Sequence, residues 1–370
     1  MKFDTLKLYN FRNYDSLSLN FAPKLNIIYG KNGSGKTNIV EALYVLALTK
    51  SFRTKDDLNL IKKGEISTRL EGKVKTNYFN DYQIIINEQG KKAKINNNSE
   101  QKLSNYISNI NIVLFQPDDQ MLLKLSPSVR RKMLNIEISQ LNKDYINYLN
   151  DYNRILKQRN FYLRELMINS NASVDYLNIL TDKLIDNGIR ICEERKKFID
   201  MINENISSIY LNIFKKGDLK VKYISHYLTK NKEEIKKIYD SKLKYDINVG
   251  KTNFGIQHDD IDFILDEESI KEWGSIGEQK NAIISFKLSE LEIFKRKKGV
   301  SPILILDDIF SELDKTKVKN IIKMLDRDIQ TFITTTEIER VNKKLAMDAK
   351  IFKVTEGKVK EVIKNERNSI

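Results

Sequence analysis

The segment GKNGSGKT at residues 30–37 constrains the fold of this chain more than any other feature. It matches the pattern G-x-x-x-x-G-K-[ST] and stands between the apolar run LNIIY at 25–29 and the helix-forming run NIVEALYVLAL at 38–48. A strand, a glycine loop and a helix in that order form a phosphate-binding loop, because the loop N–H groups and the helix N-terminus face an anion together. The sequence therefore predicts a nucleotide-binding α/β fold.

Each residue type in this loop has a chemical task. Gly33 and Gly35 let the backbone turn its N–H groups toward the phosphates. Lys36 is expected to reach the β- and γ-phosphates of ATP as a catalytic residue, and the Thr37 hydroxyl is expected to bind Mg²⁺. The predicted nucleotide-binding residues of the loop are Gly30, Lys31, Asn32, Gly33, Ser34, Gly35, Lys36 and Thr37.

A second motif, ILILDDIFSELD at 303–314, has the form of a buried strand that ends in acids. Four apolar residues place Asp307 at the carboxyl edge of the strand, beside the phosphates, where its carboxylate is predicted to hold Mg²⁺. Asp308 is then expected to polarise the attacking water as a catalytic residue. The alternative is a plain strand followed by a polar turn, which the phosphate loop in the same chain disfavours.

A third motif, GSIGEQK at 274–280, precedes the helix-forming run NAIISFKLSELEIF. A glycine turn with a serine at the start of a helix is a second phosphate-binding surface. On its own the motif is also compatible with a turn and a helix that bind nothing.

The stretch from Ser128 to Val249 contains no proline and only two glycines, which favours long helices. Apolar residues recur at steps of three and four between 141 and 166 and again between 177 and 209. The polar segment INSNASVD at 168–175 separates the two series, and Ser173 or Asp175 is expected to cap the second helix. The pattern predicts a packed helical hairpin with an arm of roughly 45 Å.

Short alternating or apolar runs on both sides of this stretch predict strands. They lie within 2–29 and 66–100 and at 303–306 and 331–334, where the last two runs are typical of buried parallel strands. We therefore expect residues 1–117 and 251–370 to form two halves of one sheet-based domain, with 118–250 as a helical insertion.

The chain carries a formal charge of +14 from 64 Lys and Arg against 50 Asp and Glu. Such an excess favours a polyanionic partner, nucleic acid before an acidic membrane surface, although a Lys-rich solvated surface would give the same number. The single cysteine excludes an intramolecular disulfide. The absence of a signal-like or 18-residue apolar segment predicts a cytoplasmic protein without a membrane span.

The three motifs in this order, split by a helical insertion, resemble the ABC-type ATPases of DNA maintenance and, among them, the RecF family. Further segments share the resemblance: LYNFRNY at 8–14, TKSFRT at 49–54, SPSVRRKML at 126–134, DDIFSELD at 307–314 and FITTTE at 332–337. The last two resemble a Walker B motif with its D-loop and a final sensor strand, in which Thr335 or a neighbour replaces the switch histidine of transporters. The resemblance implies an ABC-type P-loop ATPase head, with a mixed sheet and helices, plus an α-helical second lobe carrying a hairpin arm.

The resemblance also implies a composite site. Two ATP molecules would lie between two subunits, each held by the phosphate loop of one chain and by Ser275 and Gly277 of the other. ATP would join the homodimer and hydrolysis would release it. RecF-like proteins bind DNA in the ATP state, cooperate with RecR and help load recombinase at single-strand gaps. The implied partners are therefore DNA at gap junctions and a RecR-like mediator, and the implied activity is a weak, DNA-stimulated ATPase.

Two segments depart from the family pattern. Glu278 stands where the signature usually has glutamine, and GIQHDD at 255–260 replaces a segment resembling GPHRDD. The second segment keeps Gly255, Asp259 and Asp260 but loses a proline and a basic pair.

Several residues keep two interpretations at this point. Gln116, after the apolar run INIVLF, is the candidate for the catalytic loop that senses Mg²⁺ and links the lobes. Arg12 and Tyr14 either approach the nucleotide or only shape a turn. The basic clusters at 130–132 and 295–298 either hold DNA phosphates or cover solvated helix faces.

Two other functional classes remain open on the sequence. An ABC transporter ATPase subunit is disfavoured by the long helical insertion and by the absence of a switch histidine. An SMC-like structural DNA tether is disfavoured by the short arm and by a lone cysteine, which cannot build a cysteine hook.

Overall fold

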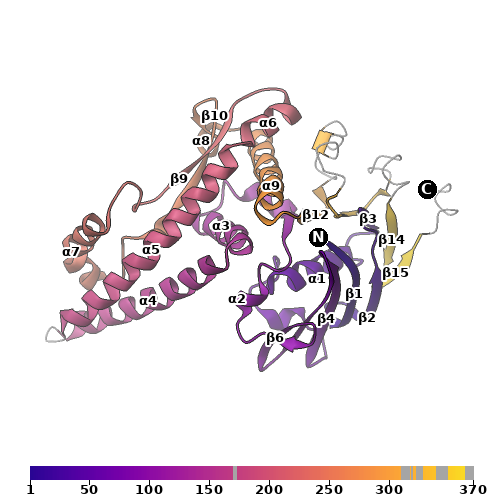
Figure 1. Ribbon diagram of the computed structural model, residues 1–370, viewed down its shortest axis with the longest axis horizontal. Helices are drawn as coiled ribbons and strands as arrows, with labels where there is room; N and C mark the ends of the chain where they lie inside the picture. Colours follow the sequence, from indigo (N-terminus) through magenta and orange to yellow (C-terminus); the bar gives the residue numbers. More distant parts are fainter. Residues whose placement is uncertain (170–172, 310–316, 318–319, 322–327, 339–348, 363–370) are drawn as a thin grey trace. The chain divides into compact units, whose positions relative to one another are not determined.

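The computed structural model describes residues 1–370 except 170–172, 310–316, 318–319, 322–327, 339–348 and 363–370 (Figure 1). The chain divides into two compact units. The head unit comprises Met1–Asp119, Leu211–Lys215 and Ile283–Ile370, and the helical unit comprises Gln120–Tyr210 and Lys216–Ala282.

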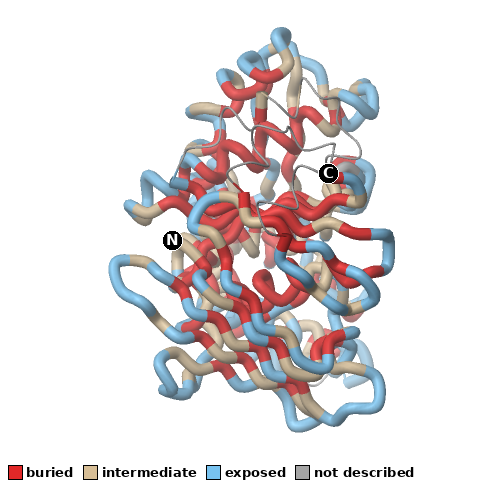
Figure 2. The backbone as a smooth tube through the Cα atoms, turned by 90° about the vertical axis from the view of Figure 1, so that its right-hand side faces the viewer, coloured by how far each residue is buried: buried red, intermediate tan, exposed pale blue. Residues whose placement is uncertain are grey.

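An antiparallel sheet forms the first layer of the head unit, with strand order β2-β1-β4-β5-β6-β7. Its strands are β1 (Lys2–Phe11), β2 (Tyr14–Asn20), β4 (Ser67–Lys75), β5 (Phe79–Asn87), β6 (Gly90–Ile95) and β7 (Asn98–Ser99). Buried and exposed residues alternate along β4 and β5, so one face of the sheet packs on the core and the other meets solvent (Figure 2). The alternation in the sequence thus predicted these hairpins correctly.

A second, mostly parallel sheet has the order β15-β14-β3-β13-β12-β8. Its strands are β3 (Leu25–Tyr29), β8 (Ile112–Phe115), β12 (Ile303–Asp307), β13 (Thr331–Thr335), β14 (Lys350–Thr355) and β15 (Lys358–Glu361). Every residue of β8, β12 and β13 is buried, which explains their unbroken apolar character. The predicted parallel strands and the α/β class are confirmed.

Helix α1 (Lys36–Leu48) occupies the space between the two sheets. It contacts β4 and β5 of the antiparallel sheet and β12 and β13 of the parallel one. Eleven of its 13 residues are buried, so it is apolar on all sides. The core of the head unit therefore surrounds the helix that follows the phosphate loop. Short turns η1 (Asp57–Leu60), α2 (Leu103–Tyr106) and η2 (Pro117–Met121) connect the remaining strands.

A long helical hairpin dominates the helical unit (Figure 1). Helix α4 (Lys143–Ile168) packs along α5 (Val174–Asn203), whose 30 residues correspond to about 45 Å. The Ser173 hydroxyl accepts a hydrogen bond from the Asp175 N–H, which confirms one of the two predicted caps. The other helices of this unit are α3 (Pro127–Leu141), α7 (Lys232–Val249), η3 (Ile256–His258) and α8 (Ile270–Trp273), while α6 (Ile206–Phe214) and α9 (Ile276–Lys298) contain residues of both units.

The helical unit also contains a small sheet, which the sequence did not predict. Strands β9 (Leu219–Ile224), β10 (Asp260–Leu265) and β11 (Glu268–Ser269) pair in the order β11-β10-β9. The run LKVKYI alternates between buried and exposed residues, which suits a strand and not a helix. Because β10 pairs with β9, the compact helical unit extends to Ala282, past the predicted boundary at residue 250.

Three buried arginine–aspartate pairs tie the elements of the helical unit together. Arg195 contacts Asp259 at 2.6 Å, and Arg159 contacts Asp246 at 2.9 Å. Arg130 lies fully buried against Asp260, with 2.6 Å between Nε and Oδ1. Neither reading of the basic cluster at 130–132 therefore holds for Arg130, because its guanidinium is neither solvated nor accessible to DNA. The acids of the GIQHDD segment are structural partners of these arginines.

Candidate functional site

The phosphate loop is held in shape by close backbone packing at its glycines. Gly35 caps α1 with a φ of 114°, and a Cβ atom there would lie 2.7 Å from the Tyr14 hydroxyl oxygen. A Cβ on Gly30 would lie 2.2 Å from the carbonyl oxygen of Val354. Both positions exclude any larger residue. The loop is further fastened by the Gly357 N–H, which donates to the Ser34 carbonyl at 3.0 Å.

The polar groups inside the loop match the needs of a phosphate chain. Lys36 is buried, and its Nζ donates to the carbonyls of Gly30 at 2.8 Å and Lys31 at 3.0 Å. Burial lowers the pKa of Lys36, and the nearby carboxylates of Asp308 and Asp307 oppose that shift. Among the described residues, the buried Ser34 hydroxyl finds no hydrogen-bond partner. The loop thus holds an ammonium and a hydroxyl that an anion would satisfy.

Strand β12 brings the first acid of the second motif directly to the phosphate loop. The Thr37 hydroxyl donates to Asp307 Oδ1 at 3.1 Å across 270 residues of sequence. Thr334 on β13 donates to the same oxygen at 2.6 Å. Burial raises the pKa of Asp307, while the hydrogen bonds from Thr334 and Thr37 act to lower it. A hydroxyl and a carboxylate therefore meet at the N-terminus of α1.

These oxygen donors fit a hard divalent cation such as Mg²⁺, which proteins commonly hold through one or two carboxylates together with phosphate oxygens. No cluster of three His, Cys, Asp or Glu side chains lies in the part of the chain that the structure describes. A cation at Asp307 and Thr37 would therefore depend on the nucleotide for further ligands.

Asp308 follows at the end of β12 with a strained backbone. Its φ is 50°, a conformation that a non-glycine residue seldom adopts and that is frequent at functional sites. Its N–H donates to the Thr334 hydroxyl at 3.0 Å, so Thr334 contacts both acids. The Thr335 hydroxyl instead donates to the Glu337 carbonyl, so the contacts with both acids favour its neighbour Thr334 as the candidate for the sensor position.

Gln116 lies at the same edge of the sheet. Phe115 pairs with Leu306 in the parallel register, so Gln116, which follows β8, and Asp307, the last residue of β12, lie at the same edge of the sheet. The Gln116 N–H donates to the Asp119 carboxylate at 2.9 Å, and the side chain is half-buried. The predicted residues Lys36, Thr37, Asp307, Asp308 and Gln116 thus all belong to the sheet edge around the phosphate loop.

Arg12 and Tyr14 support the loop from outside. Arg12 donates to both carboxylate oxygens of Glu41, at 2.9 Å and 2.6 Å, and the Tyr14 hydroxyl donates to the Gly35 carbonyl at 3.0 Å. Glu41 is fully buried on α1 and also accepts from Ser51. The structure therefore favours the structural reading of Arg12 and Tyr14. The role of Glu41 was not predicted, because nothing in the sequence around this acid indicates that Arg12 and Ser51 are its hydrogen-bond partners.

The GSIGEQK turn lies in the helical unit and opens α9. Ser275 donates through its N–H (3.0 Å) and its hydroxyl (2.8 Å) to the Glu278 carboxylate, and the Glu278 N–H donates back to the Ser275 hydroxyl at 3.2 Å. This reciprocal pattern is a capping box. The bonds from Ser275 lower the pKa of Glu278, so the departure from glutamine keeps the turn and adds a negative charge.

The turn is open to solvent. Ser275, Ile276 and Gly277 are exposed, and the only atom near a Cβ built on Gly277 is the Ser275 hydroxyl oxygen at 3.9 Å. Trp273 and Ile276 beside it expose 76% and 62% of their surface, a large amount for apolar side chains. The D-loop at 311–314 lies outside the described residues.

Comparison with known proteins places the chain among DNA-maintenance ATPases. The model of the RecF/RecN/SMC N terminal domain matches residues 2–360. The DNA replication and repair protein RecF of Geobacillus sp. (strain WCH70) is 37% identical over 363 residues, covering 96% of this chain and 97% of that protein. RecF of Latilactobacillus sakei subsp. sakei (strain 23K) is 34% identical over 371 residues, covering 98% and 99%.

Solved structures agree. The recombination mediator protein RecF-ATPrS in the RecFOR pathway superposes with a TM-score of 0.90 at 28% identity, covering 98% of each chain. An SMC head bound to the C-winged helix domain of ScpA gives a TM-score of 0.56 at 17% identity over the whole of both chains, which concerns the fold alone. No described helix is both long enough and apolar enough to cross a bilayer.

The full-length relatives support the RecF reading over a transporter subunit or an SMC-like tether. The chain belongs to the RecF family of DNA replication and repair proteins, within the RecF/RecN/SMC group of ATP-binding ATPases.

Proposed function

We propose that this chain is an ATP-dependent DNA-binding protein of recombinational gap repair and replication, with ATP and Mg²⁺ as cofactors. The observation that carries the proposal is the contact between Thr37 and Asp307, which joins the phosphate loop to the acidic strand at the N-terminus of α1. The solved relative RecF-ATP supports the choice of nucleotide.

Within one subunit, residues Gly30 to Thr37 wrap the phosphates, and Lys36 moves from its two carbonyl partners to the β- and γ-phosphates. Thr37 and Asp307 hold Mg²⁺, which supplies charge neutralisation on the phosphates. Asp308 polarises the attacking water. The hydrogen bond from its N–H to the Thr334 hydroxyl holds the backbone of Asp308 in position. Gln116 follows β8 at the same sheet edge as Asp307, and its loop senses Mg²⁺ at the site.

The second half of the site comes from another copy of the chain. Ser275 and Gly277 stand exposed at the N-terminus of α9, where the helix dipole favours an anion. The exposed Trp273 and Ile276 beside them give a second chain an apolar surface to cover. ATP bound between the two chains therefore holds the homodimer together. Hydrolysis releases the two chains, because the dimeric state binds ATP and not the products of hydrolysis.

The polyanion that matches the charge of +14 is DNA. The dimer engages DNA at single-strand gap junctions in the cytoplasm, cooperates with a RecR-like mediator and helps load recombinase. The ATPase is weak and is stimulated by DNA, since its task is to switch a clamp and not to turn over a metabolite. The description of the solved relative as a recombination mediator supports this role in loading recombinase on DNA.

The test is steady-state ATP hydrolysis per subunit, measured against protein concentration with and without duplex DNA. We expect the rate per subunit to rise with concentration, because each site needs two chains, and to rise again with DNA. A rate that depends on neither would leave the phosphate loop intact as a binding site and would refute the dimeric DNA clamp.

A further inference from the structure

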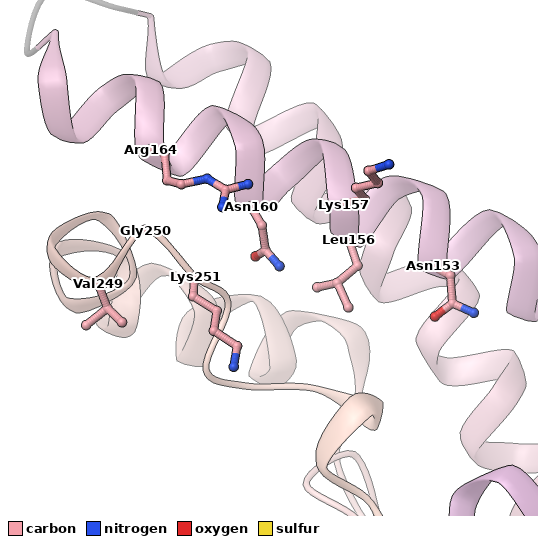
Figure 3. A pocket seen from close by; sticks show the side chains of 8 residues that line it. All are labelled: Asn153, Leu156, Lys157, Asn160, Arg164, Val249, Gly250 and Lys251. Carbon is pink, nitrogen blue, oxygen red and sulfur yellow. The ribbon is translucent and has the colours of Figure 1, made fainter. Parts of the chain in front are cut away.

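A groove in the helical unit is formed by residues that belong to none of the three nucleotide-binding motifs. It has a volume of about 490 Å³ and is formed by one face of α4 and by the loop that follows α7 (Figure 3). The helix contributes residues three and four positions apart, which share one face. The lining residues are Asn153, Leu156, Lys157, Asn160, Arg164, Val249, Gly250 and Lys251.

The charge of the groove is unbalanced. Lys157, Arg164 and Lys251 form no ion pair with any described residue, and no carboxylate lines the groove. Two other cations of the same unit do pair with acids, Lys236 with Asp182 and Lys232 with Asp186. Three cations around one concavity, without a counter-charge, favour an anionic ligand.

Two of the polar side chains are oriented by their neighbours. The Arg164 stem packs on Gly250, whose Cα lies so close that an added Cβ would approach Arg164 Cγ to 2.7 Å. Asn160 accepts hydrogen bonds from the N–H and hydroxyl of Thr252, at 2.8 Å and 2.7 Å. Its amide nitrogen therefore keeps both hydrogens for a ligand oxygen. Figure 3 shows Arg164 and Asn160 on the side of the helix that faces the loop.

The groove also has apolar walls. Leu156 and Val249 line it, and Val249 exposes 49% of its surface. One helical turn away from Val249 and Arg164 stand Tyr245 and Ile168, which expose 59% and 80%. Packing of Leu163, Leu166 and Leu177 with Leu243 and Ile247 fixes α4, α5 and α7 together beneath this surface, so the groove belongs to a rigid part of the unit.

We propose that this groove docks an acidic segment of a partner protein, one that carries carboxylates beside an apolar side chain. Carboxylates match the three cations and the Asn160 amide, and an apolar side chain fills the space between Leu156 and Val249. A nucleic-acid backbone fits less well, because phosphates gain nothing from the two aliphatic walls. The groove contains none of the predicted nucleotide-binding residues.

The test is fluorescence anisotropy with a short labelled peptide of aspartates around one phenylalanine. The wild-type chain is compared with Arg164→Glu/Lys251→Glu, with Leu156→Ser and with the control Lys183→Glu/Arg190→Glu. The control changes the charge equally at two exposed residues of α5 that do not line the groove. Circular dichroism melting establishes that each variant folds.

We expect the groove double variant to weaken peptide binding by about tenfold or more, and the control to change it less than about twofold. Leu156→Ser should weaken this peptide but leave the affinity for an all-aspartate peptide unchanged. The proposal is overturned if wild type binds the peptide with a Kd weaker than about 1 mM, or if both double variants bind alike. It is also overturned if the groove variant loses only labelled oligothymidine, which would make the groove a nucleic-acid site.

Discussion

The two glycine–serine turns of this chain use the same local device in opposite surroundings. Both precede a helix, and both offer N–H groups at its N-terminus. At Gly35 the neighbouring Tyr14 hydroxyl and Asn13 amide leave no room for a Cβ, whereas Gly277 meets only the Ser275 hydroxyl at 3.9 Å. The first turn is completed by its own chain, and the second is open.

The difference shows that the side chains surrounding a phosphate-binding turn determine whether one chain completes the site. The loop at 30–37 already has a lysine, a threonine and an aspartate in place. At the turn at 274–277, Ser275 donates to the Glu278 carboxylate of the same motif, while Ser275 and Gly277 stay exposed, which suits a surface that completes a site on another molecule. Substitutions at the two turns should therefore separate nucleotide binding from dimerisation.

The largest effect is expected from Lys36→Met. The variant removes a buried ammonium that no other described side chain replaces, and loss of a charged hydrogen bond costs about 3 kcal/mol. ATP affinity measured by titration calorimetry should fall about 100-fold. Nucleotide-dependent DNA binding should disappear with it. Retained DNA binding with ATP would mean that the phosphate loop does not control the clamp.

Ser275→Arg, at the open turn, should weaken dimerisation and leave nucleotide binding by the monomer intact. The long side chain would occupy the open turn and obstruct the second subunit, at a cost of about 2 kcal/mol. ATP-dependent dimerisation, followed by analytical ultracentrifugation, should weaken about 30-fold. ATP binding by the monomer should stay within about twofold of wild type. A variant that still dimerises normally would refute the composite site.

A paired alanine substitution sharpens the contrast between the glycines. Gly35→Ala forces a left-handed conformation and a clash with Tyr14, so ATP affinity should fall about tenfold. Gly277→Ala meets open space and should leave ATP binding by the monomer and the melting temperature unchanged. Equal losses of ATP affinity in both variants would contradict the distinction between a closed and an open turn.

Thr334→Val tests the acid beneath the phosphate loop. Burial already raises the pKa of Asp307, and removing the Thr334 donor should raise it further. Magnesium binding requires the carboxylate, so Mg²⁺-dependent ATP affinity should decline as pH falls through this pKa. The decline should begin at a higher pH in the variant, and at acidic pH the variant should bind about fivefold more weakly than wild type. The matched control is Thr335→Val, whose hydroxyl donates to the Glu337 carbonyl and accepts from the Glu337 N–H. Identical pH profiles for both variants would exclude the role of Thr334.

The pH dependence of the free energy of unfolding tests the pKa shift of Asp307 in Thr334→Val independently of nucleotide binding. Since folding raises the pKa of Asp307, its ionisation costs stability as pH rises from the unfolded to the folded pKa. The cost should be greater in Thr334→Val, because the carboxylate loses a donor. Chemical denaturation at acidic and neutral pH measures the difference.

The smallest effect is expected from Glu278→Gln. Glutamine preserves the capping box with Ser275 but removes the charge that would face the γ-phosphate of the partner's nucleotide. Dimerisation with a non-hydrolysable ATP analogue should strengthen about threefold, because a like charge near an anion is unfavourable. A weaker dimer would show that the carboxylate makes a contact that favours association.

Much of the head unit was predictable, because its signals are local or periodic. The run at 25–37 encodes a strand, a turn and a helix, and the apolar runs of β12 and β13 are too short and too continuous for anything but buried strands. The contact between Thr37 and Asp307 followed from placing both motifs at one sheet edge.

The parts that were not predictable depend on partners remote in sequence. Arg130 looks like an exposed basic residue until Asp260 is known to face it, and β9 becomes a strand through pairing with β10. Glu41 similarly needs Arg12 before its burial makes sense. Buried charges are tolerated only when paired, and a single sequence does not reveal the pairing.

The position of β3 in its sheet has a consequence for how the protein is made. This early strand lies between β13 and β14, so it finds its neighbours only when residues near the other end of the chain have been synthesised. At ordinary translation rates the interval is roughly half a minute. Throughout that time the ribosome-bound strand keeps unpaired edges, while the intervening residues of the helical unit are available to fold. A slow stretch of translation, or a chaperone acting on the nascent N-terminal segment, would therefore affect the yield of active enzyme more than its final stability.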